Sequence, residues 1–213
     1  MHSIAIFGGT FDPIHNGHIQ TSINIQNTFH FDRYYFLPCK APVLKSPSLA
    51  NSEQRIAMLN LAIKPHPEFQ LDLREIHRES PSYMVDTLES LRTENPTASV
   101  TLIIGHDAFL SLPQWHHWEK IPQLANLLVI NRAELSRQKS ITSEAIKKLL
   151  KNHQTKNKTD LLMSLAGSVV LFDAGNYTIS STLIREEIKQ EKMTSGLLPD
   201  EVCNYIKQLQ LYQ

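Results

Sequence analysis

The sequence has few cysteines, no long apolar run and no net charge. Its two cysteines, Cys39 and Cys203, lie far apart and outside any CxxC pattern, which indicates neither a disulfide framework nor a zinc site. The 21 basic side chains balance 21 acidic ones, so the overall charge points to neither nucleic acid nor a membrane surface. No apolar run could span a bilayer, and the start "MHSIAIFGG" lacks the features of a signal peptide. We therefore expect a protein of the reducing cytoplasm.

Several familiar motifs are also missing from the sequence. There is no GxxxxGK[ST], no GxGxxG after the first apolar run, no GxSxG and no HExxH. The common phosphate loop, dinucleotide fingerprint, serine-nucleophile elbow and zinc-protease helix are thereby excluded.

Short apolar runs alternate with segments of helical period. The runs cover residues 3–9, 33–38, 69–76, 99–105, 126–132 and 168–174. This alternation predicts an α/β fold, with a doubly wound, largely parallel sheet of about six strands and helices on both faces. We expect one domain over residues 1–213, with a C-terminal helical part from about residue 180. Asn51 in "NSEQ" predicts a capping box at the start of one helix.

Polar segments follow all six runs. In a parallel sheet the carboxyl ends of the strands lie at one edge, where ligands bind, so these segments should meet in one site. Residues 137–159 are polar and lysine-rich. We interpret them as a helix and a solvated loop, with a phosphate-attracting patch as the alternative.

The segment "GGTFDPIHNGH" at residues 8–18 follows the first run. Gly8 and Gly9 allow a sharp turn and close approach to a ligand, and Pro13 ends the extended stretch. A helix should begin near residue 16, and its first amides form a site for phosphate. His15 and His18 should point to the same side of its first turn. An ordinary turn with incidental histidines and a zinc site are the alternatives.

Two segments carry a resemblance. "GTFDPIHNGH" and "ISSTLIR" resemble the two signature motifs of the HIGH-type nucleotidyltransferase superfamily. Between them, "LDLREIHRESPSYMVDTLESLR" and "IIGHDAFLSLPQWHHWEKI" resemble the bacterial nicotinate-nucleotide adenylyltransferases, and the likeness extends over essentially the whole chain. The resemblance implies a Rossmann-like fold and adenylyl transfer from ATP to nicotinate mononucleotide, giving deamido-NAD and pyrophosphate in NAD biosynthesis.

The resemblance also implies roles for individual residues. Those expected to be catalytic are His18, His15 and Arg185. Those expected to bind ATP are Gly8, Gly9, Thr10, His15, His18, Gly105, Asp107, Arg132, Ser181, Thr182 and Arg185. Those expected on the mononucleotide side are Phe11, Asp12, Lys45, Ser82, Tyr83, Met84 and Trp115. Leu44 and Met84 depart from the family pattern, which commonly has histidine and threonine there.

The implied reaction is an in-line attack by a phosphate oxygen that is already an anion. It needs alignment and charge neutralisation, without a general base or a covalent intermediate. We expect Mg²⁺ with ATP, held by phosphates and water and by no dedicated metal-binding residue.

Three alternative functions are compatible with the sequence. They are a pantetheine-phosphate or glycerol-phosphate type of transferase, an enzyme preferring nicotinamide mononucleotide, and a non-catalytic nucleotide sensor. A homo-oligomer is left open.

Overall fold

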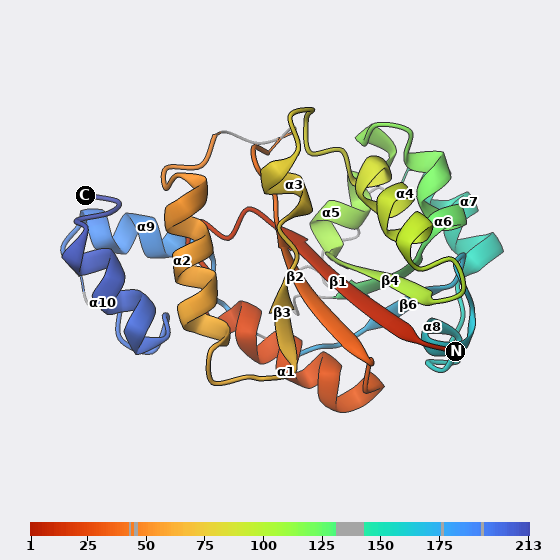
Figure 1. Ribbon diagram of the computed structural model, residues 1–213, viewed down its shortest axis with the longest axis horizontal. Coiled ribbons are helices and arrows are strands. Elements are labelled where there is room, and N and C mark those ends of the chain that lie inside the picture. The colour runs from red at the N-terminus through yellow and green to blue at the C-terminus, as the bar shows by residue number, and fades with distance from the viewer. Residues whose placement is uncertain (43, 45–46, 131–142, 176, 193) are drawn as a thin grey trace.

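The computed structural model contains a parallel β-sheet flanked by helices (Figure 1). The structure describes residues 1–42, 44, 47–130, 143–175, 177–192 and 194–213. Within these residues the sheet has six strands in the order β3-β2-β1-β4-β5-β6, and each neighbouring pair is parallel. The strands are β1 (Ser3–Gly9), β2 (Arg33–Pro38), β3 (Phe69–Leu71), β4 (Ser99–Gly105), β5 (Asn126–Ile130) and β6 (Val169–Phe172). The predicted parallel sheet is confirmed.

Helices connect the strands and follow the last one. They are α1 (Asn16–Phe29), α2 (Ser52–Ile63), α3 (Arg74–His77), α4 (Met84–Glu94), α5 (His106–Leu110), α6 (Ile121–Leu124), α7 (Glu144–His153), α8 (Asp160–Met163), α9 (Ser181–Lys189) and α10 (Asp200–Gln208), with the 3-10 turns η1 (Leu112–Gln114) and η2 (Trp118–Lys120). At α2, Asn51 and Gln54 form the predicted capping box. The helix predicted within the lysine-rich segment is α7.

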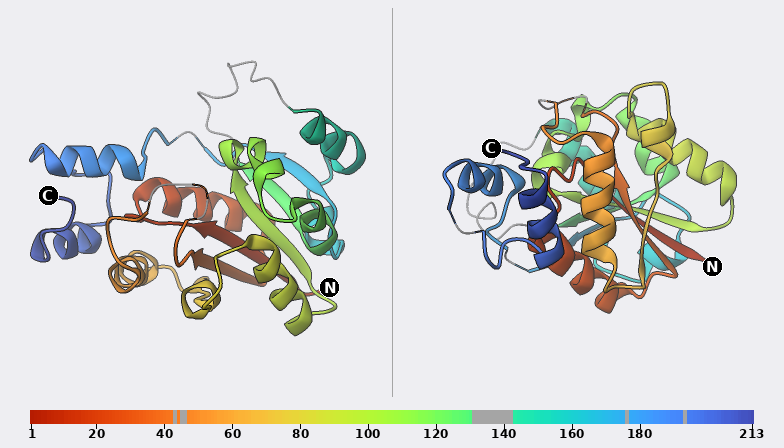
Figure 2. Two further views of the ribbon diagram at one scale, coloured as in Figure 1. Left: turned by 90° about the horizontal axis from the view of Figure 1, so that it is seen from above. Right: turned by 60° about the vertical axis from the view of Figure 1, so that its left-hand side comes forward.

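Alternate strand residues belong to two hydrophobic clusters. Ala5 and Phe7 of β1 pack in a cluster with side chains of α1, α2, α8, α9 and α10. Ile4 and Ile6 belong to a second cluster with α4, α5, α6 and α7. Because successive side chains of a strand point to opposite faces, both faces of the sheet are buried. Figure 2 shows α9 and α10 together at one end of the molecule.

The third apolar run does not form one long strand. β3 ends at Leu71 and α3 begins at Arg74, although residues 69–76 were predicted to be extended. Asp72 accepts hydrogen bonds from the backbone N and the Nε of Arg74, at 3.0 and 2.8 Å. Such a local side-chain-to-backbone bond competes with the sheet ladder and turns the chain.

The strand order reverses at β1, which lies between β2 and β4. In sheets of this kind, ligands bind at the carboxyl ends of the strands on either side of the reversal. The functional site is therefore expected beside the ends of β1 and β4. No helix formed by the described residues is long and apolar enough to cross a membrane.

Candidate functional site

The segment after β1 leads directly into α1, as predicted from Pro13 and the two histidines. The sharp turn predicted at Gly8 and Gly9 is not there, because both glycines still belong to β1 and pair with Leu37 and Pro38 of β2. Phe11 has a φ of 50° and is 3% exposed. Its ring meets those of Phe7 and His18 edge-on, with centroid distances of 5.9 and 5.2 Å. A left-handed conformation is costly for a bulky residue and persists only when its surroundings determine it. Burial of the Phe11 ring thus determines the path of this turn.

His15 and His18 cap α1 reciprocally. Nδ1 of His15 accepts from the backbone N of His18, and Nδ1 of His18 accepts from the backbone N of His15, each at 3.3 Å. Their rings are stacked, with centroids 3.6 Å apart and an interplanar angle of 24°. The two imidazoles lie on one side of the first turn, as predicted. They stand at the positive end of the helix dipole, a location that favours an anion.

Glycines are needed here because rings lie against the backbone. A Cβ on Gly17 would come 3.0 Å from Nδ1 of His15, and a Cβ on Gly9 would come 2.9 Å from the Phe11 ring. A Cβ on Gly8 would lie 3.2 Å from Cε of Met84. The glycines therefore make room for side chains that shape the turn, a use that the sequence argument did not foresee.

The second motif docks on the first. α9 begins at Ser181, as predicted, with Ser180 as its N-cap. Oγ of Ser181 donates to the carbonyl of Pro13 at 2.9 Å. Nη1 of Arg185 donates to the carbonyl of Asp12 at 2.7 Å, while its Nη2 donates to Oγ1 of Thr182 at 3.3 Å. Two segments about 170 residues apart thus form one continuous surface.

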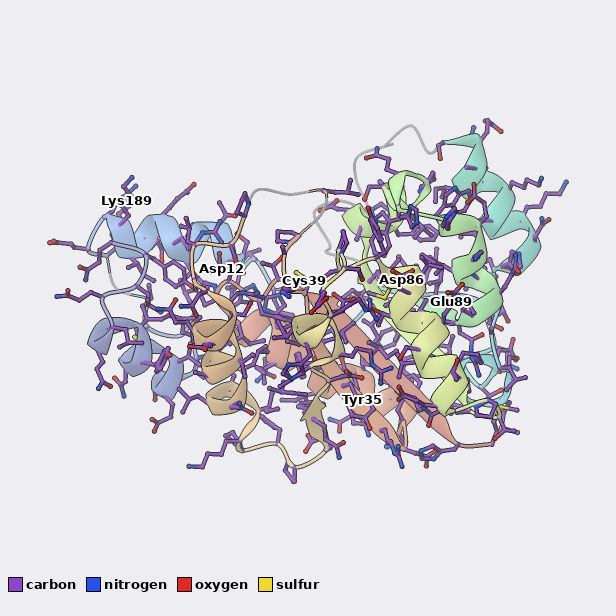
Figure 3. The ribbon with its side chains drawn as sticks, turned by 45° about the horizontal axis from the view of Figure 1, so that its top comes forward. Asp12, Tyr35, Cys39, Asp86, Glu89 and Lys189 are labelled. Atoms are coloured by element: carbon purple, nitrogen blue, oxygen red, sulfur yellow. The ribbon has the colours of Figure 1, made fainter. Side chains whose placement is uncertain are left out.

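Asp12 holds this junction together (Figure 3). Its carboxylate is 5% exposed and accepts from the backbone N of Leu49 and of Ala50 at 2.8 and 3.1 Å. The hydroxyl of Tyr212 donates a third bond at 2.8 Å. Burial and the charge of Asp12 raise the pKa of Tyr212, so its hydroxyl stays protonated and remains a donor. The Asp12 side chain was predicted to lie on the mononucleotide side. Its carboxylate instead accepts hydrogen bonds from other groups of the protein.

Arg55 links the loops after β1 and β2. Its side chain is fully buried, and its guanidinium donates to the carbonyls of Thr10 and Lys40 at 2.8 and 3.1 Å and to Oγ of Ser52 at 3.2 Å. Nearby, the thiol of Cys39 contacts Oγ1 of Thr10 at 3.7 Å, and burial raises the pKa of this thiol. Thr10 is predicted to bind ATP, and the hydrogen bond from Arg55 to its carbonyl holds its backbone in place.

The end of β4 supplies the opposite side of the site. Gly105 is the N-cap of α5, and a Cβ placed on it would meet nothing within 4 Å. Asp107 lies in the first turn of α5 with its side chain exposed. Both predicted adenosine contacts are therefore accessible beside the point where the strand order reverses.

The predicted mononucleotide residues Ser82, Tyr83 and Met84 lie at the start of α4. Oγ of Ser82 accepts from the backbone N of Lys40 at 3.1 Å. Tyr83 stacks on the His116 ring with centroids 4.2 Å apart, which joins this segment to residues 115–118, between and including the two tryptophans. Met84 and Trp115 are partly buried against the second hydrophobic cluster. The structure thus brings these two predicted segments together.

Two predicted residues, Lys45 and Arg132, lie outside the described residues. Leu44, one of the two departures from the family pattern, is described and is 55% exposed.

Sequence reasoning missed Arg55 and Tyr212. An arginine within the apolar stretch "RIAMLNLAI" was an available signal, because a charged side chain on the core side of a helix needs partners. For Tyr212 the sequence held no comparable signal, because its partner is 200 residues away.

Comparisons with known proteins show the family of the chain. A family model described as cytidylyltransferase-like matches residues 6–187. A protein of Legionella pneumophila (strain Paris), named "Probable nicotinate-nucleotide adenylyltransferase", is 57% identical over 213 residues, the full length of both chains. A protein of the same name from Marinomonas sp. (strain MWYL1) is 38% identical over 211 residues, or 99% of this chain and 94% of that one.

The fold also matches a solved structure. Plasmodium falciparum nicotinic acid mononucleotide adenylyltransferase, complexed with NaAD, superposes with a TM-score of 0.74 at 19% identity. The match covers all of this chain and 98% of the Plasmodium chain. At this level of identity the likeness concerns the fold.

Proposed function

The chain belongs to the nicotinate-nucleotide adenylyltransferase family, and we propose that its two joined motifs bind ATP for transfer of the adenylyl group to nicotinate mononucleotide. The products of this step of NAD biosynthesis are deamido-NAD and pyrophosphate. The observation that carries the proposal is the docking of Ser181 and Arg185 on the carbonyls of Pro13 and Asp12, which supports a single anion site formed by both motifs.

The reaction is a single displacement at phosphorus. A 5′-phosphate oxygen of the mononucleotide forms a bond to the α-phosphorus of ATP, and the bond from that phosphorus to the bridging oxygen breaks. The electron pair of the broken bond leaves with pyrophosphate. Because the nucleophile is an anion at neutral pH, the protein has to align the reactants and neutralise charge on the phosphoryl oxygens.

His15 and His18 are assigned to the α- and β-phosphates, with the first amides of α1. The stacked, mutually capped rings support this role, because their position is fixed before ATP arrives. Ser181, Thr182 and Arg185, at the start of α9, are assigned to the β- and γ-phosphates. The amides near Gly9 and Thr10 complete the phosphate site, while Gly8 contributes space.

The adenosine and pyridine sides are assigned to two different sets of residues at the sheet edge. Gly105 and the exposed carboxylate of Asp107 are suited to the ribose hydroxyls and adenine. Trp115, with Ser82, Tyr83 and Met84, is assigned to the mononucleotide, and its aromatic face suits an electron-poor ring. Phe11 and Asp12 are proposed to act on the mononucleotide side indirectly, because they fix the conformation of the backbone between β1 and α1. Lys45 and Arg132 remain assigned as cations for the mononucleotide and for ATP.

Mg²⁺ is proposed to enter with ATP. Among the described residues, no group of three or more histidine, cysteine, aspartate or glutamate side chains could hold a metal ion. The proposed ligands are phosphate oxygens and water, as Mg²⁺ commonly has at nucleotide sites, and the ion would neutralise part of the phosphate charge. A cytoplasmic location is proposed as well, and it is supported by Cys39 and Cys203, which are both free thiols.

The test is product analysis with the purified protein, Mg²⁺, ATP and nicotinate mononucleotide. We expect deamido-NAD and pyrophosphate in equal amounts. With ATP carrying a chiral α-thiophosphate, the product should show inverted configuration at phosphorus. Retention would mean a covalent intermediate, and tight ATP binding without any product would mean a nucleotide sensor.

A further inference from the structure

In the carboxyl-terminal tail, residues 209–213, the side chain of Tyr212 reaches the site. Tyr212 follows α10, and its hydroxyl donates to Oδ1 of Asp12, in the turn between β1 and α1. Figures 1 and 3 show the C-terminus and Asp12 at the same end of the molecule, near α2 and α9. No residue close to Tyr212 in sequence belongs to either motif.

The contact is specific. Tyr212 has a φ of 68°, a left-handed conformation that is unfavourable for a tyrosine, and its ring packs on the first hydrophobic cluster. A backbone in this region is retained only where surrounding contacts over-determine it. The hydroxyl is therefore directed at Asp12 by the local fold of the tail.

Asp12 transmits this contact to the second motif. The carboxylate is nearly fully buried and is held by Tyr212 and by the backbone amides of Leu49 and Ala50. The carbonyl of the same residue accepts from Arg185, at 2.7 Å. A buried carboxylate that loses a donor must move or admit water, and movement of Asp12 moves the carbonyl that holds Arg185.

We infer that Tyr212 is a positioning residue for adenylyl transfer, which acts through Asp12 to hold Arg185 beside His15 and His18. The inference rests on the proposed role of Arg185 at the phosphates. A tail that merely anchors α10 would affect stability and leave the reaction unchanged.

The test is a double-mutant cycle on Tyr212→Phe and Arg185→Ala. Y212F removes one hydroxyl and keeps the ring. We expect kcat to fall roughly five- to tenfold with KM for both substrates within about twofold of wild type. In the R185A background, the same substitution should cost less than about twofold, because the group that it positions is gone. R185M, which also removes the cation and its donors, provides a second background if R185A folds poorly.

The control is Tyr205→Phe. Tyr205 is a partly buried residue of α10 and packs on the first hydrophobic cluster, as Tyr212 does. Y205F should leave kcat unchanged, and all assays are run well below the unfolding temperature of each variant. Equal losses from Y212F in both backgrounds, or a wild-type kcat in Y212F, would overturn the inference. These outcomes differ from those expected if the proposed function itself is wrong. In that case R185A would retain wild-type activity, or the wild-type protein would form no product.

Discussion

At the scale of single residues, His18 is the side chain on which the reaction should depend most. Its ring is held by the stack on His15 and by edge contacts with Phe7 and Phe11. A donor fixed in this way needs no reorganisation as charge develops on the phosphates.

We predict that His18→Ala lowers kcat by roughly 10²-fold or more, as expected for loss of one preorganised donor. Steady-state pyrophosphate release measures the change, and circular dichroism checks the fold. His117→Ala, at an exposed position, is the matched control and should stay near wild type. An H18A enzyme within a few-fold of wild type would remove His18 from the mechanism.

Trp115 and Trp118 offer a second residue-scale comparison. Both are partly buried against the same cluster, so replacing either by alanine should lower stability. We predict that only Trp115→Ala also raises KM for the mononucleotide far more than KM for ATP, because only Trp115 is assigned to the pyridine ring. Equal effects on the two substrates in W115A would count against stacking.

Single residues were also where sequence reasoning was weakest. His15 and His18 could be predicted because the helix start that unites them is local. The partners of Asp12 could not, because they come from residues 49, 50 and 212. Hydrogen bonds between distant segments leave no periodic pattern in a sequence.

At the scale of elements, the first turn of α1 is built around the absence of a side chain at Gly17. An alanine in a helix is normally more favourable than glycine by roughly 1 kcal/mol. Here its Cβ would lie 3.0 Å from Nδ1 and 3.1 Å from Cε1 of His15. Stability and activity are therefore expected to respond differently.

We predict that Gly17→Ala changes thermal stability little, because the gain in helix propensity offsets the close contact, and that it lowers kcat by displacing His15. Parallel thermal unfolding and steady-state kinetics separate the two effects. Gly196→Ala, at a positive φ with open space around it, is a contrasting variant that should lose stability and keep its kcat. A fully active G17A enzyme would contradict the assigned importance of the His15 position.

The α3–α4 pair carries two glutamates with opposite pKa shifts. Burial raises the pKa of Glu75, which accepts a hydrogen bond from Thr87. The hydrogen bond from Arg74 lowers the pKa of Glu94. For Glu75 the folded state binds the proton more tightly, so its stabilising effect is present at low pH and is lost as pH rises through the folded pKa. For Glu94 the stabilising effect is present above the unfolded pKa and is lost as pH falls.

We predict that Glu75→Gln becomes more stable relative to wild type as pH rises from about 4 to about 8, whereas Glu94→Gln becomes less stable relative to wild type. Urea unfolding across this range measures both trends, and each variant serves as the control for the other. Because Glu94 is largely exposed, its trend should be the smaller one and should weaken with salt. Parallel trends in the two variants would refute the assignment.

The starts of α1, α2 and α9 and the positions of the strands could be predicted from the sequence, because caps and apolar periods are local. The break at Asp72 could not, since "FQLDLREI" reads as one extended run until the turn formed by that side chain is known. The type and approximate position of a helix or strand were thus easier to predict from the sequence than the residues at which it ends.

At the scale of the whole molecule, parallel strands collect the loops that follow them at one edge of the sheet. The alternation of apolar runs with helices predicted this convergence. It did not predict the strand order, which is set by contacts between distant segments. That order is what places the end of β1 beside the end of β4.

We propose that this edge of the sheet transfers an adenylyl group from ATP to nicotinate mononucleotide. The most direct measurement is pyrophosphate release with Mg²⁺ and ATP, comparing nicotinate mononucleotide, nicotinamide mononucleotide and phosphopantetheine as acceptors in parallel. We predict a strong preference for nicotinate mononucleotide, with Leu44 and Met84 as tolerated variation. Preference for nicotinamide mononucleotide or phosphopantetheine, or no release with any of the three acceptors, would contradict this function.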